Sequence, residues 1–381
     1  LQAIWRSLPD SVGALTSRGA PQTSLQGALH VVRVPLQHER AALLATITLA
    51  ADGRVAGFLV QPAPAPPAAP LPPSAGTVER ALDVGSGPNA LPGTLALPRG
   101  ASADQPVAAV VLVHGSGPQD RVETIGPNRP FLDLARGLAG RGIAVLRYEK
   151  RTKAHPEAFV GRDFTIDAET TDDAVAAVAT LRSTAGVDPA RVFVLGHSQG
   201  GMLAPRIVAR SGAAGAVLLA APARPLLDLL LEQNRRLAAL DGTTSPEEDG
   251  AIANLVAQVD RARTDTAAPA ADLPMRLPAA YWRSTDAVDP IAEARTLQRP
   301  LLVLHGGRDL QVVDADWSLW RQAFAGSRRV TLKRYDALNH LGIAGKGPAS
   351  LAEYQTPGHV DASLIDDVAA WIAAQPRAAA K

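Results

Sequence analysis

The sequence contains no cysteine among its 381 residues. Disulfide bonds, thiolate catalysis and thiolate metal sites are therefore excluded, and the absence agrees with an oxidising compartment. The chain starts at Leu1, within the amphipathic stretch LQAIWRSL, and not at a methionine. We therefore expect that a signal peptide or further N-terminal residues have been removed, and the sequence does not show which.

The sequence also lacks an excess of either charge and lacks a long apolar run. Its 38 basic and 37 acidic residues give a net charge of +1, so there is no electrostatic reason to expect nucleic acid or an anionic membrane as a partner. No stretch reaches about 18 consecutive apolar residues, so no membrane span is expected. The composition is ordinary for a globular protein, and the length suggests about two domains of ~150 residues each.

Residues 1–60 are predicted to form a small β-rich accessory domain of the α+β type. Runs rich in Val, Leu and Thr cover 28–36, 40–50 and 53–62. The turn signal ADG at 51–53 predicts a hairpin between the last two runs.

A proline-rich stretch, QPAPAPPAAPLPPSAG, covers residues 61–76. Proline removes backbone donors and favours extended structure, so we predict a semi-rigid linker here, with a ligand for a proline-recognising partner as the alternative. The remaining residues, 77–381, are expected to form the second domain.

The second domain alternates continuous apolar runs with helical patterns. Because the runs lack polar alternation, they indicate strands buried on both faces, as in a parallel sheet. Strands that alternate with helices indicate an open α/β sheet, with functional residues at the carboxyl ends of the strands. Strands are expected over 93–98, 107–115, 141–149, 191–196, 215–221, 299–306 and the first part of 329–343, and helices over 131–142 and 165–183.

Residues 225–298 contain no strand-like run, but 226–240 and 247–262 have helical patterns. About seventy residues of helix and loop exceed what a connection between two strands needs, so we predict a helical cap over the active site. Within this segment Tyr281 and Trp282 are candidate walls of the substrate pocket. Packing of cap helices against the sheet is the alternative role for both.

The stretch GHSQG at 196–200 fits the pattern Gly-x-Ser-x-Gly. A buried strand precedes it and the helical segment GMLAPRIVARSG follows. This is the setting of a nucleophile elbow, in which small neighbours allow a strained turn. We therefore predict Ser198 as a nucleophile in preference to a turn serine, and we expect a bend at Pro205 in the following helix.

A serine nucleophile needs a base and an orienting carboxylate, which follow it in the order Ser, Asp or Glu, His in this architecture. Asp309 follows the strand in LLVLHGGRDLQV, and His340 stands in the loop after RVTLKRY. We predict Asp309 as the acid and His340 as the base; a solvated turn aspartate and a packed loop histidine are the structural alternatives. His359 is the rival base, His305 is expected to cap its strand, and the side chain of His197 is expected to point away from the reacting face.

Acyl transfer also needs hydrogen-bond donors for the developing oxyanion. One is expected to be the backbone N–H of Gln199, and the second comes from LVHGSGPQDR at 112–121, through Ser116 or alternatively Gly117. This loop lacks the Lys-Ser/Thr of a phosphate-binding loop and the spacing of a dinucleotide fingerprint. No cluster of His, Asp and Glu has metal-ligand spacing, so we expect neither a metal nor another cofactor.

The motifs GTLALP, VLVHGSGPQDR, VLRYEKR, GVDPARVFVLGHSQGGMLAP, LLVLHGGRD and NHLGIAGKGPASLAEYQTPGHV resemble those of the α/β-hydrolase superfamily. More narrowly, the chain is similar to bacterial esterases that join an N-terminal domain to a dienelactone-hydrolase-like or prolyl-oligopeptidase-like domain. The resemblance covers roughly 77–381. It implies an α/β-hydrolase fold with Ser198 as nucleophile, Asp309 as acid and His340 as base.

The resemblance is incomplete in two places. The N-terminal unit resembles a nuclear-transport-factor-like accessory domain, but the first part of that domain is missing. In YEKRT at 148–152, Glu149 and Thr152 replace residues of the commoner Tyr-Asp-Lys-Arg-Gly. We interpret these substitutions as structural drift that leaves the chemistry intact.

The expected function is hydrolysis of a small-molecule carboxylic ester through an acyl-enzyme on Ser198. A peptidase or amidase with the same triad is one alternative, although residues 1–60 are too small for the large β domain of such peptidases. A binding protein with a vestigial triad is another, and the complete Ser, Asp, His order argues against it. We expect a secreted or periplasmic bacterial protein, with a cytoplasmic location as the alternative. A homodimer is left open by the sequence.

Overall fold

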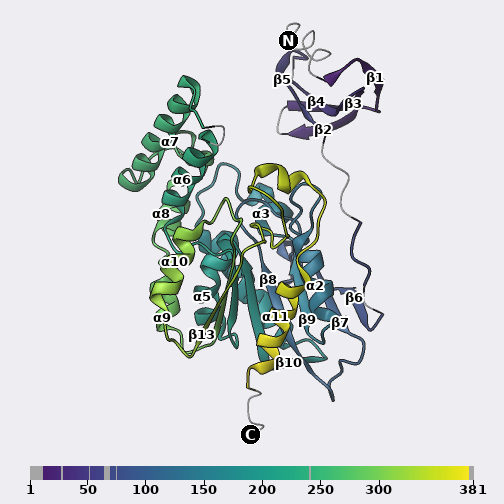
Figure 1. Cartoon of the computed structure of the whole chain (residues 1–381), viewed down its shortest axis with the longest axis vertical. Helices are drawn as coiled ribbons and strands as arrows, with labels where there is room; N and C mark the ends of the chain where they lie inside the picture. Colours follow the sequence, from purple (N-terminus) through teal and green to yellow (C-terminus); the bar gives the residue numbers. More distant parts are fainter. Residues whose placement is uncertain are drawn as a thin grey trace. The chain divides into compact units, whose positions relative to one another are not determined.

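The structure, a computed structural model, describes residues 12–26, 29–50, 52–63, 69–73, 75–239 and 242–376. The chain divides into two units, Leu1–Pro67 with Tyr354–Pro357 and Ala68–Glu353 with Gly358–Lys381 (Figure 1). Some sequence predictions fall outside the described residues, namely the stretch LQAIWRSL, Ala51 of the ADG turn, and residues 64–68 and 74 of the proline-rich stretch.

The first unit contains an antiparallel sheet of five strands in the order β1-β3-β4-β5, with β2 also paired to β3. The predicted hairpin is present, and it pairs Ile47 with Phe58. Leu36, Leu43 and Ala45 form the buried cluster of this unit. The strands are β1 (Leu15–Arg18), β2 (Gln22–Gln26), β3 (Leu29–His38), β4 (Ala42–Leu49) and β5 (Val55–Pro62).

The second unit is built on an eight-stranded sheet in the order β13-β12-β11-β10-β8-β9-β7-β6. The strands from β13 to β9 are parallel, and β7 and β6 are antiparallel additions at one edge. Every residue of β9, β11 and β12 is buried, which explains their continuous apolar runs. The strands are β6 (Thr77–Ala81), β7 (Gly93–Pro98), β8 (Val107–Val113), β9 (Ala144–Tyr148), β10 (Val187–His197), β11 (Ala216–Leu219), β12 (Leu301–Gly306) and β13 (Val330–Tyr335).

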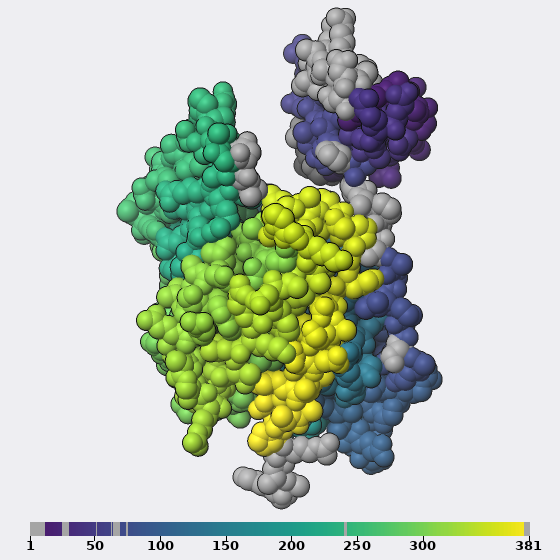
Figure 2. Space-filling view, in the orientation of Figure 1, coloured from purple at the N-terminus to yellow at the C-terminus, as the bar shows by residue number. Residues whose placement is uncertain are grey.

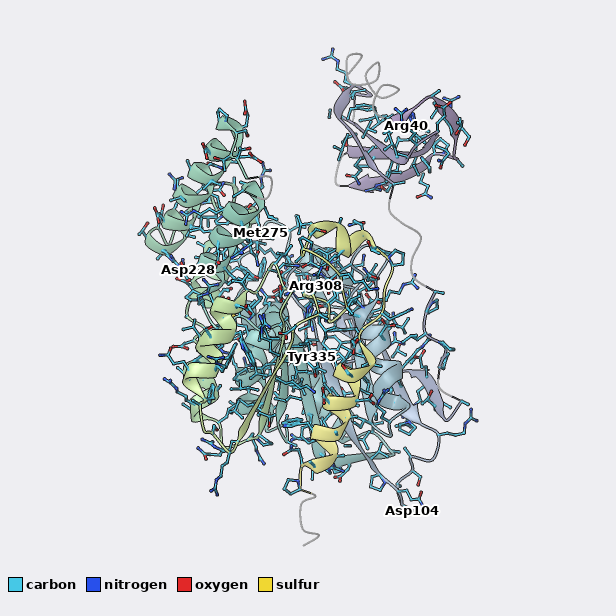
Figure 3. The ribbon with its side chains drawn as sticks, viewed as in Figure 1. Arg40, Asp104, Asp228, Met275, Arg308 and Tyr335 are labelled. Carbon is cyan, nitrogen blue, oxygen red and sulfur yellow. The ribbon has the colours of Figure 1, made fainter. Side chains whose placement is uncertain are left out.

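Helices cover both faces of this sheet, and side chains fill the space between the layers (Figure 3). One core contains residues of α2 and α11, and the other contains residues of α4, α5 and α10. This three-layer arrangement is the predicted α/β-hydrolase fold. These helices are α2 (Pro130–Ala139), α3 (Arg151–Ala154), α4 (Asp172–Arg182), α5 (Gln199–Ser211), α10 (Asp314–Ala323) and α11 (Ala362–Ala374), and the short helical turns are η1 (Gly87–Asn89), η2 (Pro156–Ala158), η3 (Asp167–Thr171), η4 (Ala270–Asp272), η5 (Pro274–Arg276) and η6 (Leu351–Gln355).

Four helices, and no strand among the described residues, lie between β11 and β12. The helices α6 and α7 project from the body of the second unit (Figure 2). Ser245 and Glu248 form a capping box at the start of α7, which satisfies its first amides. The four helices are α6 (Leu226–Ala238), α7 (Pro246–Thr264), α8 (Ala279–Asp286) and α9 (Pro290–Thr296).

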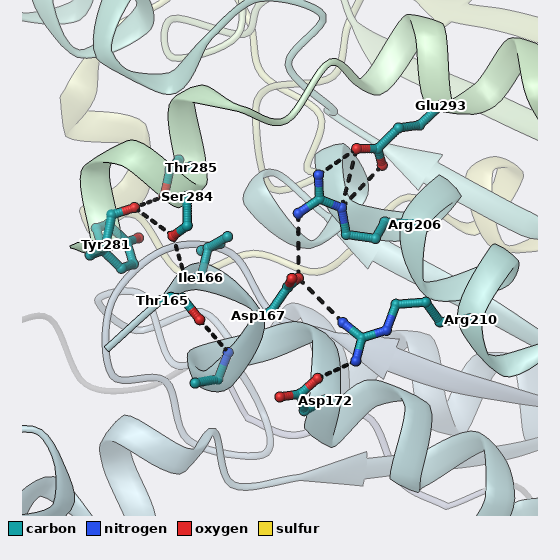
Figure 4. Close-up of polar contacts among 11 residues, drawn as sticks. Thr165, Ile166, Asp167, Asp172, Arg206, Arg210, Tyr281, Ser284, Thr285 and Glu293 are labelled. Atoms are coloured by element: carbon teal, nitrogen blue, oxygen red, sulfur yellow. Dashed lines mark hydrogen bonds and ion pairs between the residues drawn. The ribbon is translucent and has the colours of Figure 1, made fainter. Parts of the chain in front are cut away.

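Polar contacts attach α8 and α9 to the segment around η3 (Figure 4). The Oγ of Ser284 in α8 accepts a hydrogen bond from the amide of Ile166 at 2.9 Å. Arg206 of α5 donates to Glu293 of α9 at 3.1 Å and lies 3.4 Å from Asp167. None of the described helices is both long and apolar enough to cross a membrane.

Candidate active site

Ser198 occupies the sharp turn between β10 and α5. Its φ of 54° and ψ of −120° are strained for a residue with a side chain, and its amide donates to the carbonyl of Leu219 at 2.9 Å. A Cβ on Gly196 would collide with the backbone of Gly200. A Cβ on Gly200 would collide with carbonyl oxygens at the end of β8, those of Val113 and His114. The small residues around Ser198 are therefore required by close backbone packing.

Helix α5 begins directly after Ser198 and runs without interruption through Pro205 to Ser211. Gln199 is its first residue, so no preceding helical turn supplies an acceptor for the amide of Gln199. The partial positive charge at this helix end favours an anion there. The position of Gln199 therefore fits the predicted oxyanion donor.

Asp309 and His340 form a buried pair beyond the ends of β12 and β13. Nδ1 of His340 lies 2.7 Å from Oδ2 of Asp309, and the two side chains are 3% and 0% exposed. The other carboxylate oxygen, Oδ1, accepts hydrogen bonds from the amides of Gln311 and Val312 at 2.8 and 2.9 Å. With a proton on Nδ1 held by the carboxylate, the Nε2 of His340 is left as an acceptor.

A second buried pair, Glu123 and His197, lies next to the first. Nε2 of His197 donates to the carbonyl of His340 at 2.9 Å, and Nδ1 lies 3.0 Å from Oε2 of Glu123. Burial by itself lowers the pKa of His197, but the Glu123 carboxylate outweighs burial and raises this pKa above its ordinary value. Burial correspondingly raises the pKa of Glu123, but His197 outweighs it and lowers this pKa. The pair is therefore held in its charged form.

The loop after β8 reaches the nucleophile. A Cβ added to Gly115 would lie 3.3 Å from the Cβ of Ser198. The amide of Gly115 donates to Oε1 of Glu123 at 2.7 Å. Gly117 has a φ of +83°, which favours glycine at this position. The structure therefore brings Ser116 and Gly117 to the same cavity as Ser198.

That cavity has a volume of about 300 Å³ and apolar walls supplied largely by α6 and α8. The candidate residues Tyr281 and Trp282 both line it. The Tyr281 hydroxyl accepts a hydrogen bond from Nε2 of Gln199 at 2.8 Å, and Nε1 of Trp282 donates to the carbonyl of Pro274 at 3.1 Å. Met275 (labelled in Figure 3) also lines the cavity and has a strained φ of 54°.

The other histidines of the sequence analysis do not join the Asp309–His340 pair. His359 lies 3.1 Å from Asp133. His305 stacks on Trp317 and lies 3.3 Å from Asp314. Among the described residues, no group of three His, Asp or Glu side chains could hold a metal ion.

Comparison with known proteins gives the family of the chain. Residues 104–343 match the serine aminopeptidase S33 family. The chain belongs to this family of α/β-hydrolases. It is 36% identical to Esterase EstD of Thermotoga maritima over 379 residues, which cover 98% of this chain and 86% of the relative.

Solved structures of other hydrolases also align with the chain at low identity. The esterase domain of a Rhodothermus marinus protein is 21% identical, with a TM-score of 0.46, and the alignment covers 77% of this chain and 97% of that domain. The esterase Est2 of Thermogutta terrifontis is 18% identical, with a TM-score of 0.48, and the alignment covers 80% and 96% of the two chains.

The sequence analysis of this S33-family chain did not predict three buried charged residues that lie next to the candidate site: Glu123, Lys150 and Glu169. Lys150 belongs to YEKRT directly after a buried strand, and a lysine in that position is the signal that could have marked it. Of the two substituted residues in this motif, Glu149 pairs with Arg121 at 2.7 Å and Thr152 lines the cavity.

Proposed function

We propose that this protein hydrolyses small carboxylic esters through an acyl-enzyme on Ser198. The observation that carries the proposal is the buried Asp309–His340 pair, joined at 2.7 Å, in loops at the same sheet edge as the strained turn of Ser198. The name of the relative Esterase EstD supports the same reaction.

In this mechanism the Nε2 of His340 accepts the proton of Ser198 Oγ as that oxygen attacks the ester carbonyl carbon. The amides of Gln199 and Ser116, or alternatively Gly117, donate to the oxyanion of the tetrahedral intermediate. The imidazolium then protonates the leaving alcohol, and the acyl group stays on Ser198. Water attacks the acyl-enzyme while His340 accepts a proton from it. The imidazolium then returns this proton to Ser198 Oγ as the bond to the acyl carbon breaks, and the carboxylic acid leaves. Asp309 stays ionised and holds the imidazole tautomer throughout.

The cavity suggests the size of the acyl group. Its volume of about 300 Å³ and its leucine-rich wall suit a short apolar acyl chain. A second cavity of about 740 Å³ shares Pro118, Thr152, Phe164 and Leu277 with the first, and we assign the alcohol part of the ester to it.

The name of the family raises a second candidate, an aminopeptidase. Such an enzyme has to bind the ammonium group of its substrate, and a free carboxylate is the natural partner. Glu169 supplies the one carboxylate among the described residues that line the catalytic cavity, and its Oε1 lies 3.0 Å from Nζ of Lys150. Because Lys150 already compensates its charge, Glu169 is a poor partner for the ammonium group of a peptide N-terminus. The cavity therefore favours an ester substrate over a peptide.

The proposal is tested with p-nitrophenyl acetate and its matched anilide, p-nitroacetanilide. Wild-type protein is expected to hydrolyse the ester far faster than the anilide, and Ser198→Ala is expected to lose up to ~10⁶ of the rate if the triad acts as a unit. A fluorophosphonate probe is expected to label the wild type and not Ser198→Ala, whereas the exposed control Ser183→Ala is labelled normally. An unlabelled wild type would favour a binding protein, and a faster anilide reaction would favour the peptidase.

A further inference from the structure

Lys150, directly after β9, is 2% exposed. A buried ammonium group is costly unless it is paired and hydrogen-bonded. Its Nζ lies 2.9 Å from the carbonyl oxygen of Gly115, 3.0 Å from Oε1 of Glu169 and 3.3 Å from Oε1 of Gln199. These three acceptors account for the three N–H donors of an ammonium group. Lys150 is not among the described residues that line the catalytic cavity, so it acts through these three partners.

The bond to Gly115 sets the direction of the neighbouring amide. The peptide that links Gly115 to Ser116 is trans, and in a trans peptide the C=O and N–H groups point in opposite directions. A carbonyl directed at Lys150 therefore directs the N–H of Ser116 away from it. The amide of Gly115 is also held, by Glu123, so the peptide groups on both sides of Gly115 are anchored by buried charges. A cation on the carbonyl also polarises the amide and strengthens its N–H as a donor.

The bond to Gln199 reaches the other proposed oxyanion donor. The side chain of Gln199 accepts from Lys150 and donates to the Tyr281 hydroxyl, so both ends of its amide are engaged. This fixes the side chain of Gln199, the first residue of α5, whose backbone N–H is the other proposed oxyanion donor. One ammonium group thus contacts the residues on both sides of the hole, one after β8 and one after β10.

Glu169 balances the charge of Lys150. It lies in η3, a π-helical turn, and π-turns inside helices are frequent at functional sites. It is 4% exposed, and its second oxygen accepts a hydrogen bond from the hydroxyl of Thr170 at 3.2 Å. Without Lys150 this carboxylate would be buried without a cationic partner.

We propose that Lys150 is a positioning residue that holds the oxyanion hole, through the carbonyl of Gly115 and the side chain of Gln199, and that Glu169 compensates its charge. The inference rests on the proposed function. Removing Lys150 is expected to have two separate consequences. The unpaired carboxylate of Glu169 lowers the stability of the fold, and the loss of the bond to Gly115 weakens stabilisation of the transition state.

The test compares Lys150→Met with the double variant Lys150→Met/Glu169→Gln. Methionine replaces the stem of lysine and removes the charge and donors, and the glutamine removes the unpaired carboxylate. We expect the melting temperature to fall in the single variant and to recover in the double variant, while kcat stays about 10²-fold low in both with KM nearly unchanged. Lys153 is an exposed lysine of helix α3, the helix that begins directly after Lys150. Lys153→Met is therefore the matched control and is expected to behave as wild type.

A trifluoromethyl ketone supplies the readout that a merely structural role would not change. Its adduct with Ser198 places an oxyanion in the hole, so its inhibition is expected to weaken by the same factor as kcat/KM. Recovery of kcat in the double variant, or unchanged inhibition, would overturn the inference. If the double variant does not fold, Lys150→Gln replaces it, because glutamine keeps an N–H donor for the carbonyl of Gly115. The expected loss of kcat is then about tenfold, and an unchanged kcat would overturn the inference. If the wild type does not hydrolyse the ester, the proposed function itself is refuted, whereas active wild type and double variant refute only the role of Lys150.

Discussion

Asp309→Asn is expected to abolish activity without unfolding the protein, because the surroundings of Asp309 dictate how the new amide is oriented. Oδ1 of Asp309 faces two backbone N–H donors, those of Gln311 and Val312. An asparagine has to place its oxygen there, since its NH₂ group would otherwise face two donors. The NH₂ group then takes the place of Oδ2, 2.7 Å from Nδ1 of His340 in the native protein, and donates to that nitrogen.

The wrong imidazole tautomer follows. With Nδ1 as acceptor, the proton of His340 lies on Nε2, which can no longer accept the proton of Ser198. The same change in serine proteases lowers kcat about 10⁴-fold, which corresponds to roughly 5.4 kcal/mol of activation free energy. The melting temperature is expected to change little, because both backbone donors keep an acceptor.

Asp309→Ala is the comparison that separates tautomer from packing. It leaves the buried N–H of Val312 and the part-buried N–H of Gln311 without this acceptor. The buried group alone costs about 1–3 kcal/mol, so the variant is expected to lose stability as well as activity. Steady-state hydrolysis of p-nitrophenyl acetate and urea unfolding measure the two effects. A kcat of Asp309→Asn within tenfold of wild type, with its fold intact, would refute the tautomer argument.

Three further predictions concern stability and specificity. Gly200→Ala is expected to lose more than about 3 kcal/mol of stability on urea unfolding, because its methyl overlaps carbonyls at the end of β8. Gly250→Ala, with open space in helix α7, is expected to gain up to about 1 kcal/mol, and equal stabilities of the two variants would contradict this. Glu123→Gln is expected to cost about 3–5 kcal/mol near pH 6, where wild-type Glu123 and His197 are both charged. The pKa of His197 is raised and that of Glu123 is lowered, so the stability advantage of the wild type is fully present between the ordinary glutamate pKa of 4.5 and the ordinary histidine pKa of 6.5. The advantage is lost as the pH rises through the raised pKa of His197 or falls through the lowered pKa of Glu123. A constant difference in melting temperature between wild type and variant across pH would refute the assignment. Leu230→Ala enlarges the catalytic cavity and is expected to shift the preference in a panel of p-nitrophenyl esters towards longer acyl chains, and an unchanged preference would place the acyl group elsewhere.

The fold could be predicted wherever burial leaves a mark on the sequence. The central strands β9, β11 and β12 are buried on both faces, so nearly every position requires an apolar side chain. The strands β1, β2 and β6 were not predicted. The four residues of β1 are all exposed. Both β1 and β2 are formed by backbone pairing with β3: β1 pairs with the distant end of β3, and β2 pairs with its near end. Short polar strands of this kind depend on their partner and not on their own side chains.

The candidate site divides in the same way. Ser198 and Asp309 follow buried strands, and His340 stands in the loop after the partly exposed strand β13. Local pattern and chain order were therefore enough to nominate the three residues, and the structure joins Asp309 to His340 directly. The surroundings of these residues were not predictable. Lys150 contacts residues 35 and 49 positions away, and contacts of that separation leave no local pattern.

The sequence by itself determined which residues follow the strand ends, because buried strands and strained turns restrict their own residue types. Only the tertiary structure decided which charges are buried together: Glu123 with His197, and Lys150 with Glu169. The physical reason is that a charged side chain in a sequence looks like a solvated surface residue. It becomes a buried pair only when separate loops, brought together by the order of the strands, remove both partners from water.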